Sequence, residues 1–221
     1  MFISHHWWHR KYRERPYADE PGDRCGAPDY MTDQKSGEPK GLKHAVICAG
    51  VERLIEDKSW ERKKVMLWID WQSVYQDRDD EKDKAMRSLI KYASSCRAML
   101  IPTDYVTAAE APARVEQIRG FGTRGFCRLE VLAYALWRAI RQGGFHPEVV
   151  QGVELYAAMR DGAIRRYIEV FLPQRAQDLP DHGEFSTAED RKVVHAMQEM
   201  ILQRVGMDSM SGVSQTVPEL A

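Results

Sequence analysis

Short apolar segments that alternate with amphipathic segments are the feature of this sequence that most constrains its fold. The apolar segments, each built around large aliphatic or aromatic side chains, are residues 1–4, 63–71 and 97–102. The segments between and after them repeat apolar residues every three or four positions, as one face of a helix does; these are 41–60, 81–94 and 126–141. Alternating strands and helices are the pattern of right-handed βαβ units. We therefore predict an α/β fold built on a parallel sheet.

Each helical segment carries an apolar stripe that marks the side packing inward. The stripes are Ile47, Val51, Leu54 and Ile55; Met86, Leu89, Ile90 and Ala93; and Leu129, Leu132, Ala133, Leu136 and Ile140. A capping box, Ser186-Thr187-Ala188-Glu189, opens a last helix. The inward side of that helix is formed by Val194, Met197 and Ile201.

Two further segments indicate how strands are arranged. The apolar centre of 63–71 is unbroken, which is typical of a parallel strand buried on both faces. Between 154–159 and 163–170, Asp161-Gly162 indicates a hairpin, although one strand with an edge addition fits the pattern equally well.

The composition is that of an ordinary globular domain. The 221 residues are 43% hydrophobic and 29% charged, and 32 basic against 33 acidic residues leave a net charge of −1. Nucleic acid is therefore not an expected partner. The four cysteines form no CxxC pair, which favours a reducing compartment, and no apolar run approaches the ~20 residues of a membrane span. We expect a cytoplasmic protein without membrane contact, with one domain over 1–205, a loop insertion at 9–40 and a flexible tail at 206–221.

The ends of the predicted strands indicate where a ligand would bind. Open parallel sheets bind ligands at the carboxyl ends of their strands. Ser4 and His5 stand at the end of the first predicted strand, Asp70 and Trp71 end the second, and the loop 103–125 follows the third. The rule brings all of these to one edge of the molecule, which becomes the predicted site.

In this order, the segments resemble the motifs of the Toll/interleukin-1 receptor (TIR) domain family. The first motif is the apolar strand Phe2-Ile3-Ser4-His5, and the strongest is Phe126-Cys127-Arg128-Leu129-Glu130, where the family has Trp-Cys-x-x-Glu. Residues 67–86 are also similar to heterokaryon-incompatibility proteins, which are regarded as relatives of TIR domains. The resemblance spans residues 1–140. It implies a flavodoxin-like three-layer fold, with a central, mostly parallel sheet of about five strands and helices on both faces.

The resemblance also implies an activity, which is cleavage of the nicotinamide–ribose bond of NAD in the family's enzymatic members. The family's catalytic glutamate corresponds to Glu130, NAD is the substrate, and neither a cofactor nor a metal is implied. The product would be ADP-ribose or a cyclic form, made in signalling or innate immune defence. Enzymes of the family often act as homo-oligomers.

The chemistry of this reaction agrees with a glutamate in that role. A cationic pyridinium leaves without being protonated, so the barrier lies in an oxocarbenium-like ribosyl centre. A fixed carboxylate stabilises that charge or holds a ribose hydroxyl. Aromatic rings are expected to stack on the bases and an arginine to meet a phosphate. The expected substrate-binding residues are Ser4, His5, Trp7, Asp70, Trp71, Arg124, Phe126 and Cys127, with Trp8 as a further candidate for stacking.

Plainer interpretations exist for several of these residues. A glutamate early in a helix is commonly a surface residue favoured by the helix dipole. Asp70 also fits as a cap of the following loop, and Cys127 fits a small buried residue better than a nucleophile. Possible metal-ligand types stand near the N-terminus without a second cluster, so no metal is expected. They are His5, His6, His9 and Cys25.

A different class of function fits the same motifs. Many TIR domains are non-catalytic and act by self-association, for which the loops 72–80 and 103–124 are the candidate surfaces. A third interpretation is another N-glycosidic enzyme that acts on a nucleotide or nucleoside.

Overall fold

A computed structural model describes residues 1–4, 42–69, 84, 88–141, 153–167, 178–185 and 187–204, with the backbone alone for 136–141 and 204. These residues form a five-stranded sheet of order β2-β1-β3-β4-β5. The strands are β1 Phe2–Ile3, β2 Trp68–Ile69, β3 Met99–Pro102, β4 Leu155–Ala158 and β5 Ile164–Tyr167. Neighbouring strands are parallel except for β4 and β5, which are antiparallel. The predicted α/β fold with a mostly parallel sheet is confirmed.

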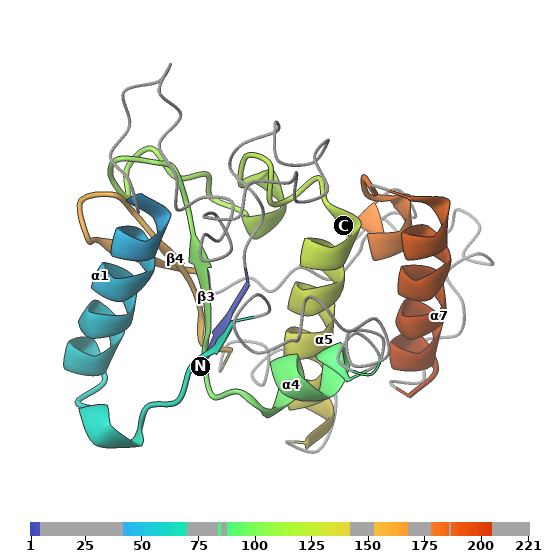
Figure 1. Cartoon of the computed structure of the whole chain (residues 1–221), viewed down its shortest axis with the longest axis horizontal. Helices are drawn as coiled ribbons and strands as arrows, with labels where there is room; N and C mark the ends of the chain where they lie inside the picture. The colour runs from blue at the N-terminus through green and yellow to red at the C-terminus, as the bar shows by residue number, and fades with distance from the viewer. Residues whose placement is uncertain are drawn as a thin grey trace, which may run out of the picture.

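Helices lie on both faces of the sheet and complete the three layers (Figure 1). The α-helices of the described residues are α1 Leu42–Asp57, α4 Leu89–Ser95, α5 Gly125–Arg141 and α7 Ala188–Arg204. Helix α1 covers one face, α4 and α5 cover the other, and α7 packs on the outer side of α5. Three short 3-10 helices lie in the connections: η2 Arg62–Lys64, η3 Val115–Gln117 and η5 Pro180–His182.

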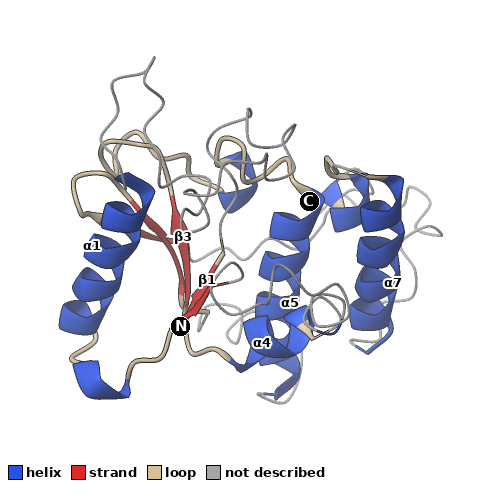
Figure 2. Ribbon diagram, viewed as in Figure 1, coloured by secondary structure: helices blue, strands red, loops and turns tan. Residues whose placement is uncertain are grey.

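The strands lie between helices in Figure 2, and successive residues of β1 and β3 alternate between two apolar cores. In β3, Met99 and Ile101 belong to the core shared with α4 and α5, while Leu100 belongs to the core shared with α1. A strand turns successive side chains to opposite faces, so one short strand contributes to both cores. The sheet is therefore enclosed by helices on its two sides.

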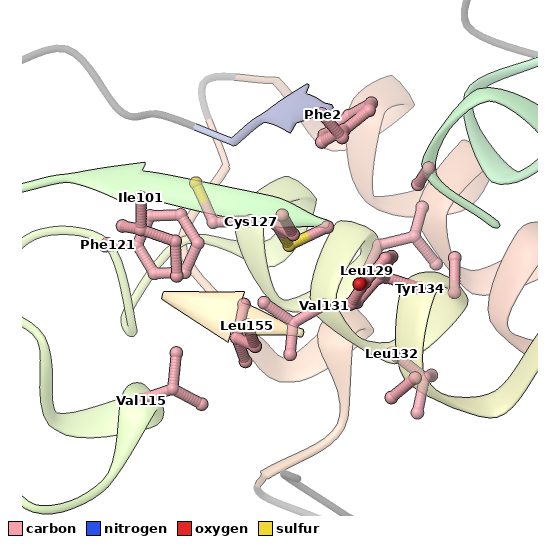
Figure 3. Close-up of a cluster of buried hydrophobic side chains, with 14 of the residues drawn as sticks. Phe2, Ile101, Val115, Phe121, Cys127, Leu129, Val131, Leu132, Tyr134 and Leu155 are labelled. Atoms are coloured by element: carbon pink, nitrogen blue, oxygen red, sulfur yellow. The ribbon is translucent and has the colours of Figure 1, made fainter. Parts of the chain in front are cut away.

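Helix α5 fills the larger of these cores. Figure 3 shows its residues Leu129, Leu132 and Tyr134 among the side chains of the sheet. All three are fully buried, and so is Ala133; the described members of the predicted stripe, Leu129, Leu132 and Ala133, are thus confirmed. The hydroxyl of Tyr134 donates to the carbonyl oxygens of Arg97 (2.9 Å) and Glu154 (3.1 Å), at the amino ends of β3 and β4. Because its polar atom is satisfied there, the ring can be buried without an unpaired donor.

Helix α1 confirms its predicted inward face and lies very close to the sheet. Val51 and Leu54 are buried, and so is Ile47. Gly50 faces the strands: a Cβ at this position would lie 2.6 Å from the Cβ of Ala158. The absence of a side chain at Gly50 therefore sets how closely the helix and β4 can approach.

The parallel strand predicted within 63–71 is confirmed, but the burial predicted for it on both faces is wrong. The strand is limited to Trp68–Ile69 and lies at the edge of the described sheet, while Met66 is 79% and Leu67 42% exposed. An edge strand has a neighbour on one side only, so its apolar run is not enclosed. Trp68 is covered by aromatic rings instead, stacking on Phe2 with ring centroids 4.6 Å apart and on Tyr92 at 5.2 Å.

The C-terminal elements confirm the predicted hairpin and last helix. Strands β4 and β5 pair around a turn that contains Asp161 and Gly162, and Gly162 adopts a φ of +83°, a value that glycine favours. The inward residues of α7 are buried as predicted: Val194, Met197 and Ile201. The helix is capped by Thr187, whose hydroxyl oxygen accepts the amide of Asp190 at 3.1 Å. The predicted cap, Ser186, lies outside the described residues.

The strand order creates a switch point between β1 and β3. The chain passes from β1 to its neighbour β2 and then returns across β1 to add β3 on the other side. Connections on the two sides of such a point leave the sheet toward opposite faces, which opens a crevice beyond the carboxyl ends of the two strands. Ser4 directly follows β1, so it lies at this point.

A polar cluster at the amino end of β4 joins the end of α1 to the sheet. The ammonium of Lys58 contacts both carboxylate oxygens of Glu154 (3.0 and 2.8 Å), to which the Tyr156 hydroxyl also donates. Desolvation, the largest single influence, raises the pKa of Glu154, but hydrogen bonds from Lys58 and Tyr156, helped by the charges of Lys58 and Arg166, outweigh it. The pKa of Glu154 is therefore lowered from its usual 4.5.

This cluster predicts a pH-dependent stability. Because the folded-state pKa of Glu154 lies below the unfolded value, its contribution is complete above that value and is lost as the pH falls through the folded-state pKa. We expect Glu154→Gln to lower the free energy of unfolding by about 1–3 kcal/mol at neutral pH, and the difference from wild type to shrink in acid. Urea unfolding at a series of pH values measures it.

Glu61 offers a matched control for this experiment. Its ion pair with Lys64 is exposed, with 57% of the Glu61 side chain accessible to solvent. Glu61→Gln should therefore change the free energy of unfolding by less than about 0.5 kcal/mol. A loss in Glu154→Gln that is the same at every pH would contradict the role given to the Glu154 carboxylate.

Candidate active site

The candidate active site is centred on Glu130, in the second turn of α5. Its side chain faces the sheet, on the same side of the helix as Cys127 one turn before it and Tyr134 one turn after it. Glu130 is only 8% exposed, so the plain interpretation of a surface glutamate at a helix start is wrong. A carboxylate removed from water in this way is costly unless polar groups compensate it.

One compensating group is the hydroxyl of Ser4, which donates to Glu130 Oε2. Ser4 is 1% exposed, and the bond joins positions that are 126 residues apart in the sequence. Hydrogen bonds to an ionised acceptor are about twice as strong as neutral ones. The sequence placed both residues at one edge of the sheet, and the structure brings their side chains into direct contact at the switch point.

Arg124 precedes α5 and holds an unsatisfied donor. Its Nη1 atom is buried and has no hydrogen-bond partner among the described residues. Buried guanidinium groups are normally paired, and their preferred partners are carboxylate and phosphate oxygens. An anionic ligand at the start of α5 would satisfy this atom.

Phe126 and Cys127, the other described residues of the predicted site, take part in packing. The Phe126 ring meets the ring of Phe185 edge to face, with centroids 6.0 Å apart. Cys127 is 3% exposed and lies in the core between α5 and the sheet, as Figure 3 shows. This position agrees with the interpretation of Cys127 as a small buried residue.

Residues 178–185, which we call the strap, lie across the start of α5. The amide of Gly125 donates to the Glu184 carbonyl (3.2 Å), and the Glu184 amide donates to the Thr123 carbonyl (2.8 Å). Arg128 ties the strap to the preceding loop, since its guanidinium reaches the carbonyls of Gly122 (2.7 Å) and Leu179 (3.3 Å). The sequence carries no local signal of this arrangement, because Arg128 and Leu179 are 51 positions apart.

The 103–124 loop, predicted as an interaction surface, is fastened to β5 and to the core at several points. Arg165 on β5 donates to the carbonyls of Ala108 (3.2 Å) and Ala111 (2.8 Å). Tyr167 donates to the carbonyl of Pro112 at 3.1 Å. Burial raises the pKa of Tyr167 to about 12, so its phenol stays a neutral donor at physiological pH. Buried side chains anchor the rest of the loop: Val115, Ile118 and Phe121.

Several predicted positions lie outside the described residues. They are His5, Trp7, Asp70, Trp71, Trp8 and the loop 72–80, together with His6, His9 and Cys25. Within the described ranges, no three His, Cys, Asp or Glu side chains come together in a group that could hold a metal ion. No helix of those ranges is long and apolar enough to cross a membrane.

No family model, curated protein or solved structure matches this chain. The resemblance to TIR domains therefore rests on the sequence motifs.

The contact between the strap and α5 predicts that even one methyl group added at Gly125 destabilises the fold. A Cβ at Gly125 would overlap the ring of Phe185. Gly125→Ala should therefore lower the free energy of unfolding by about 1–3 kcal/mol, although alanine favours the helical state. Urea unfolding measures the loss.

The variant Phe185→Ala provides the matched test of this cause. With the ring removed, the added methyl group has space, so the double variant should lose less stability than the sum of the single losses. We expect a coupling of about 0.5–3 kcal/mol. Strictly additive losses would show that the Phe185 ring is not what excludes a side chain at Gly125.

Proposed function

We propose that this chain is a TIR-like NAD glycohydrolase that releases nicotinamide from NAD. The observation that carries the proposal is the buried Glu130 carboxylate, hydrogen-bonded to Ser4 at the switch point of a parallel sheet. Perturbed or buried carboxylates at such points are typical of functional sites. The motif around Glu130, Phe126-Cys127-Arg128-Leu129-Glu130, supports the choice of NAD.

The reaction breaks the bond between C1′ of the ribose and the pyridinium nitrogen. The electron pair of that bond stays on the nitrogen, which turns the cationic ring into neutral nicotinamide. Water then attacks C1′ and loses a proton, giving ADP-ribose; attack by a nitrogen of the adenine would give a cyclic product instead. Since nicotinamide leaves without being protonated, the transition state needs stabilisation of positive charge on the ribosyl centre.

Glu130 is suited to supply that stabilisation. A carboxylate held at a fixed position in a largely dry site interacts strongly with a developing cation, because little water screens the charge. The same carboxylate also accepts a hydrogen bond from a ribose hydroxyl. Glu130 therefore acts as a fixed negative charge, and no proton donation by it is required.

Arg124 is the proposed contact for the pyrophosphate of NAD. It stands directly before α5, whose second turn carries Glu130, so the two residues lie at the same end of this helix. Its buried Nη1 lacks a partner among the described residues, and phosphate oxygens are strong acceptors for a guanidinium.

The alternative is a non-catalytic TIR-like domain that acts by self-association. Exposed apolar side chains near the edge strand β2 favour it, namely Met66 at 79% and Leu67 at 42% exposure. Enzymes of this kind often assemble to complete their site, so a homo-oligomer is compatible with either function. The loops 72–80 and 103–124 are the proposed surfaces, and NAD release distinguishes the two functions.

The first test is whether nicotinamide is released and whether release depends on Glu130. We expect purified protein to convert NAD to nicotinamide, and Glu130→Gln to reduce kcat by at least about 100-fold, because the charge is lost while the shape is kept. Chromatographic assay of NAD, NADP and free nucleosides side by side identifies the substrate and separates linear from cyclic product.

Glu154→Gln is the matched control, since Glu154 is a partly buried glutamate at the amino end of β4. It should lose stability and keep its turnover. Full activity in Glu130→Gln would overturn the assignment of Glu130. Concentration-dependent assembly without turnover of NAD, NADP or nucleosides would favour the interaction domain.

The role of Arg124 predicts a change in KM. We expect Arg124→Gln to raise KM for NAD by roughly 10–100-fold with little change in kcat, as for loss of a hydrogen bond to a charged group. Nicotinamide riboside has no pyrophosphate, so its hydrolysis should be unaffected by the substitution. Steady-state kinetics on both substrates measures this difference.

Arg119→Gln is the matched control for Arg124, because Arg119 lies in the same loop with 74% of its side chain exposed. Its KM for NAD should stay within about twofold of wild type. An equal loss of activity toward NAD and nicotinamide riboside in Arg124→Gln would exclude a phosphate contact.

A further inference from the structure

Ser4 is held rigidly by the sheet on its backbone side. Its amide donates to the carbonyl of Leu100 at 3.0 Å, which continues the pairing of β1 with β3 beyond the last strand residue. Its side chain is 1% exposed. The hydroxyl of Ser4 therefore occupies a position determined by the two central strands.

The hydroxyl is directed at a single acceptor, Glu130 Oε2. A serine hydroxyl has one hydrogen to donate, so this bond uses its whole donor capacity. The donor is thus engaged by the carboxylate, although the sequence alone suggested that Ser4 binds substrate. Ser4 acts on the reaction through Glu130.

The buried hydroxyl of Thr103, at the same edge of the sheet, donates to a different kind of acceptor from that of Ser4. Thr103 follows β3 as Ser4 follows β1, and it is also 1% exposed. Its hydroxyl donates to the carbonyl of Ala158 at 2.8 Å and so satisfies the backbone of the neighbouring strand. The hydroxyl of Ser4, in contrast, serves a side chain on a helix.

The bond restricts a torsion that the helix backbone leaves adjustable. The last torsion of a glutamate is broad, so the helix alone does not determine where its two oxygens point. With Oε2 held by Ser4, the direction of the second oxygen is set as well. A catalytic group must be held within a few tenths of an ångström of its working position, since small displacements cost large factors in rate.

We propose that Ser4 is a positioning residue that orients the Glu130 carboxylate toward the ribosyl centre. This inference rests on the proposed function, because it assigns Ser4 a role in the same reaction. It separates two contributions: Glu130 supplies the charge, and the carboxyl end of β1 determines where that charge lies.

The test compares substitutions at Ser4 in NAD hydrolysis by the full chain. We expect Ser4→Ala to lower kcat by about 10-fold or more while KM for NAD stays within about threefold, since the transition state is affected and ground-state binding is not. Ser4→Thr keeps a hydroxyl and should restore most of kcat. If the added methyl of threonine prevents folding, Ser4→Gly serves as the second variant. It removes the hydroxyl without adding volume, so it should lower kcat as Ser4→Ala does.

Thr103→Ala is the control for loss of a buried hydroxyl at this edge. It should lower the midpoint of thermal unfolding as Ser4→Ala does, and leave kcat within about twofold of wild type. Loss of stability alone would therefore not reproduce the kinetic effect.

The outcomes distinguish the inference from the function on which it rests. If wild type is active and Glu130→Gln is inactive, an unchanged kcat in Ser4→Ala overturns the role of Ser4 and leaves the function standing. A raised KM with unchanged kcat would make Ser4 a substrate contact and also overturn its positioning role. Absence of nicotinamide release by wild type would overturn the function and the inference together.

Discussion

The central strand β1 is the constraint on which the rest of the structure depends. Its two residues pair with Trp68–Ile69 on one side and with Met99–Leu100 on the other, so β1 joins β2 to the remaining strands. Phe2 packs into the core of α4 and α5, while Ile3 packs into the core of α1. The chain reverses direction across the sheet at this strand, which creates the switch point beside Ser4. Two residues thus determine the sheet, both cores and the place of the site.

The site follows from how α5 is fastened on either side of Glu130. Toward its middle, Tyr134 is buried with its hydroxyl bound to carbonyls at the amino ends of β3 and β4. At its start, Arg128 and the backbone of Gly125 are joined to the strap, residues 178–185. Glu130 lies between these attachments, so the helix has little freedom to rotate. A carboxylate on this part of α5 can therefore be aimed at the end of β1 with one hydrogen bond to Ser4.

The carboxylates of Glu154 and Glu130 are held in different ways. Glu154 is surrounded by cationic partners, Lys58 and Arg166, and its pKa is lowered. Glu130 Oε2 accepts a hydrogen bond from the neutral hydroxyl of Ser4. The Glu154 cluster thus fastens the end of α1 to the amino end of β4, while the bond of Glu130 joins α5 to the carboxyl end of β1.

Local patterns determined much of the architecture, and their limits are physical. The apolar stripes on α1 and α5, the turn at Asp161 and Gly162, and the α/β class were predictable because they depend on residues close in sequence. The exposure of the segment 63–71 was not predictable. Whether a strand is central or at an edge of the sheet depends on which strands pair with it. The start of α7 was predictable as well, because the hydroxyl that caps it, Thr187, lies within the predicted box Ser186-Thr187-Ala188-Glu189.

For the candidate site, the sequence by itself determined which residue types stand at which strand and helix ends, including Ser4, Arg124 and Glu130. Only the tertiary structure decided that Ser4 donates to Glu130, that Arg124 holds a buried donor without a partner among the described residues, and that the strap covers the start of α5. The reason is that these contacts join positions tens to more than a hundred residues apart. Their distances are set by packing of the cores, which no local pattern encodes.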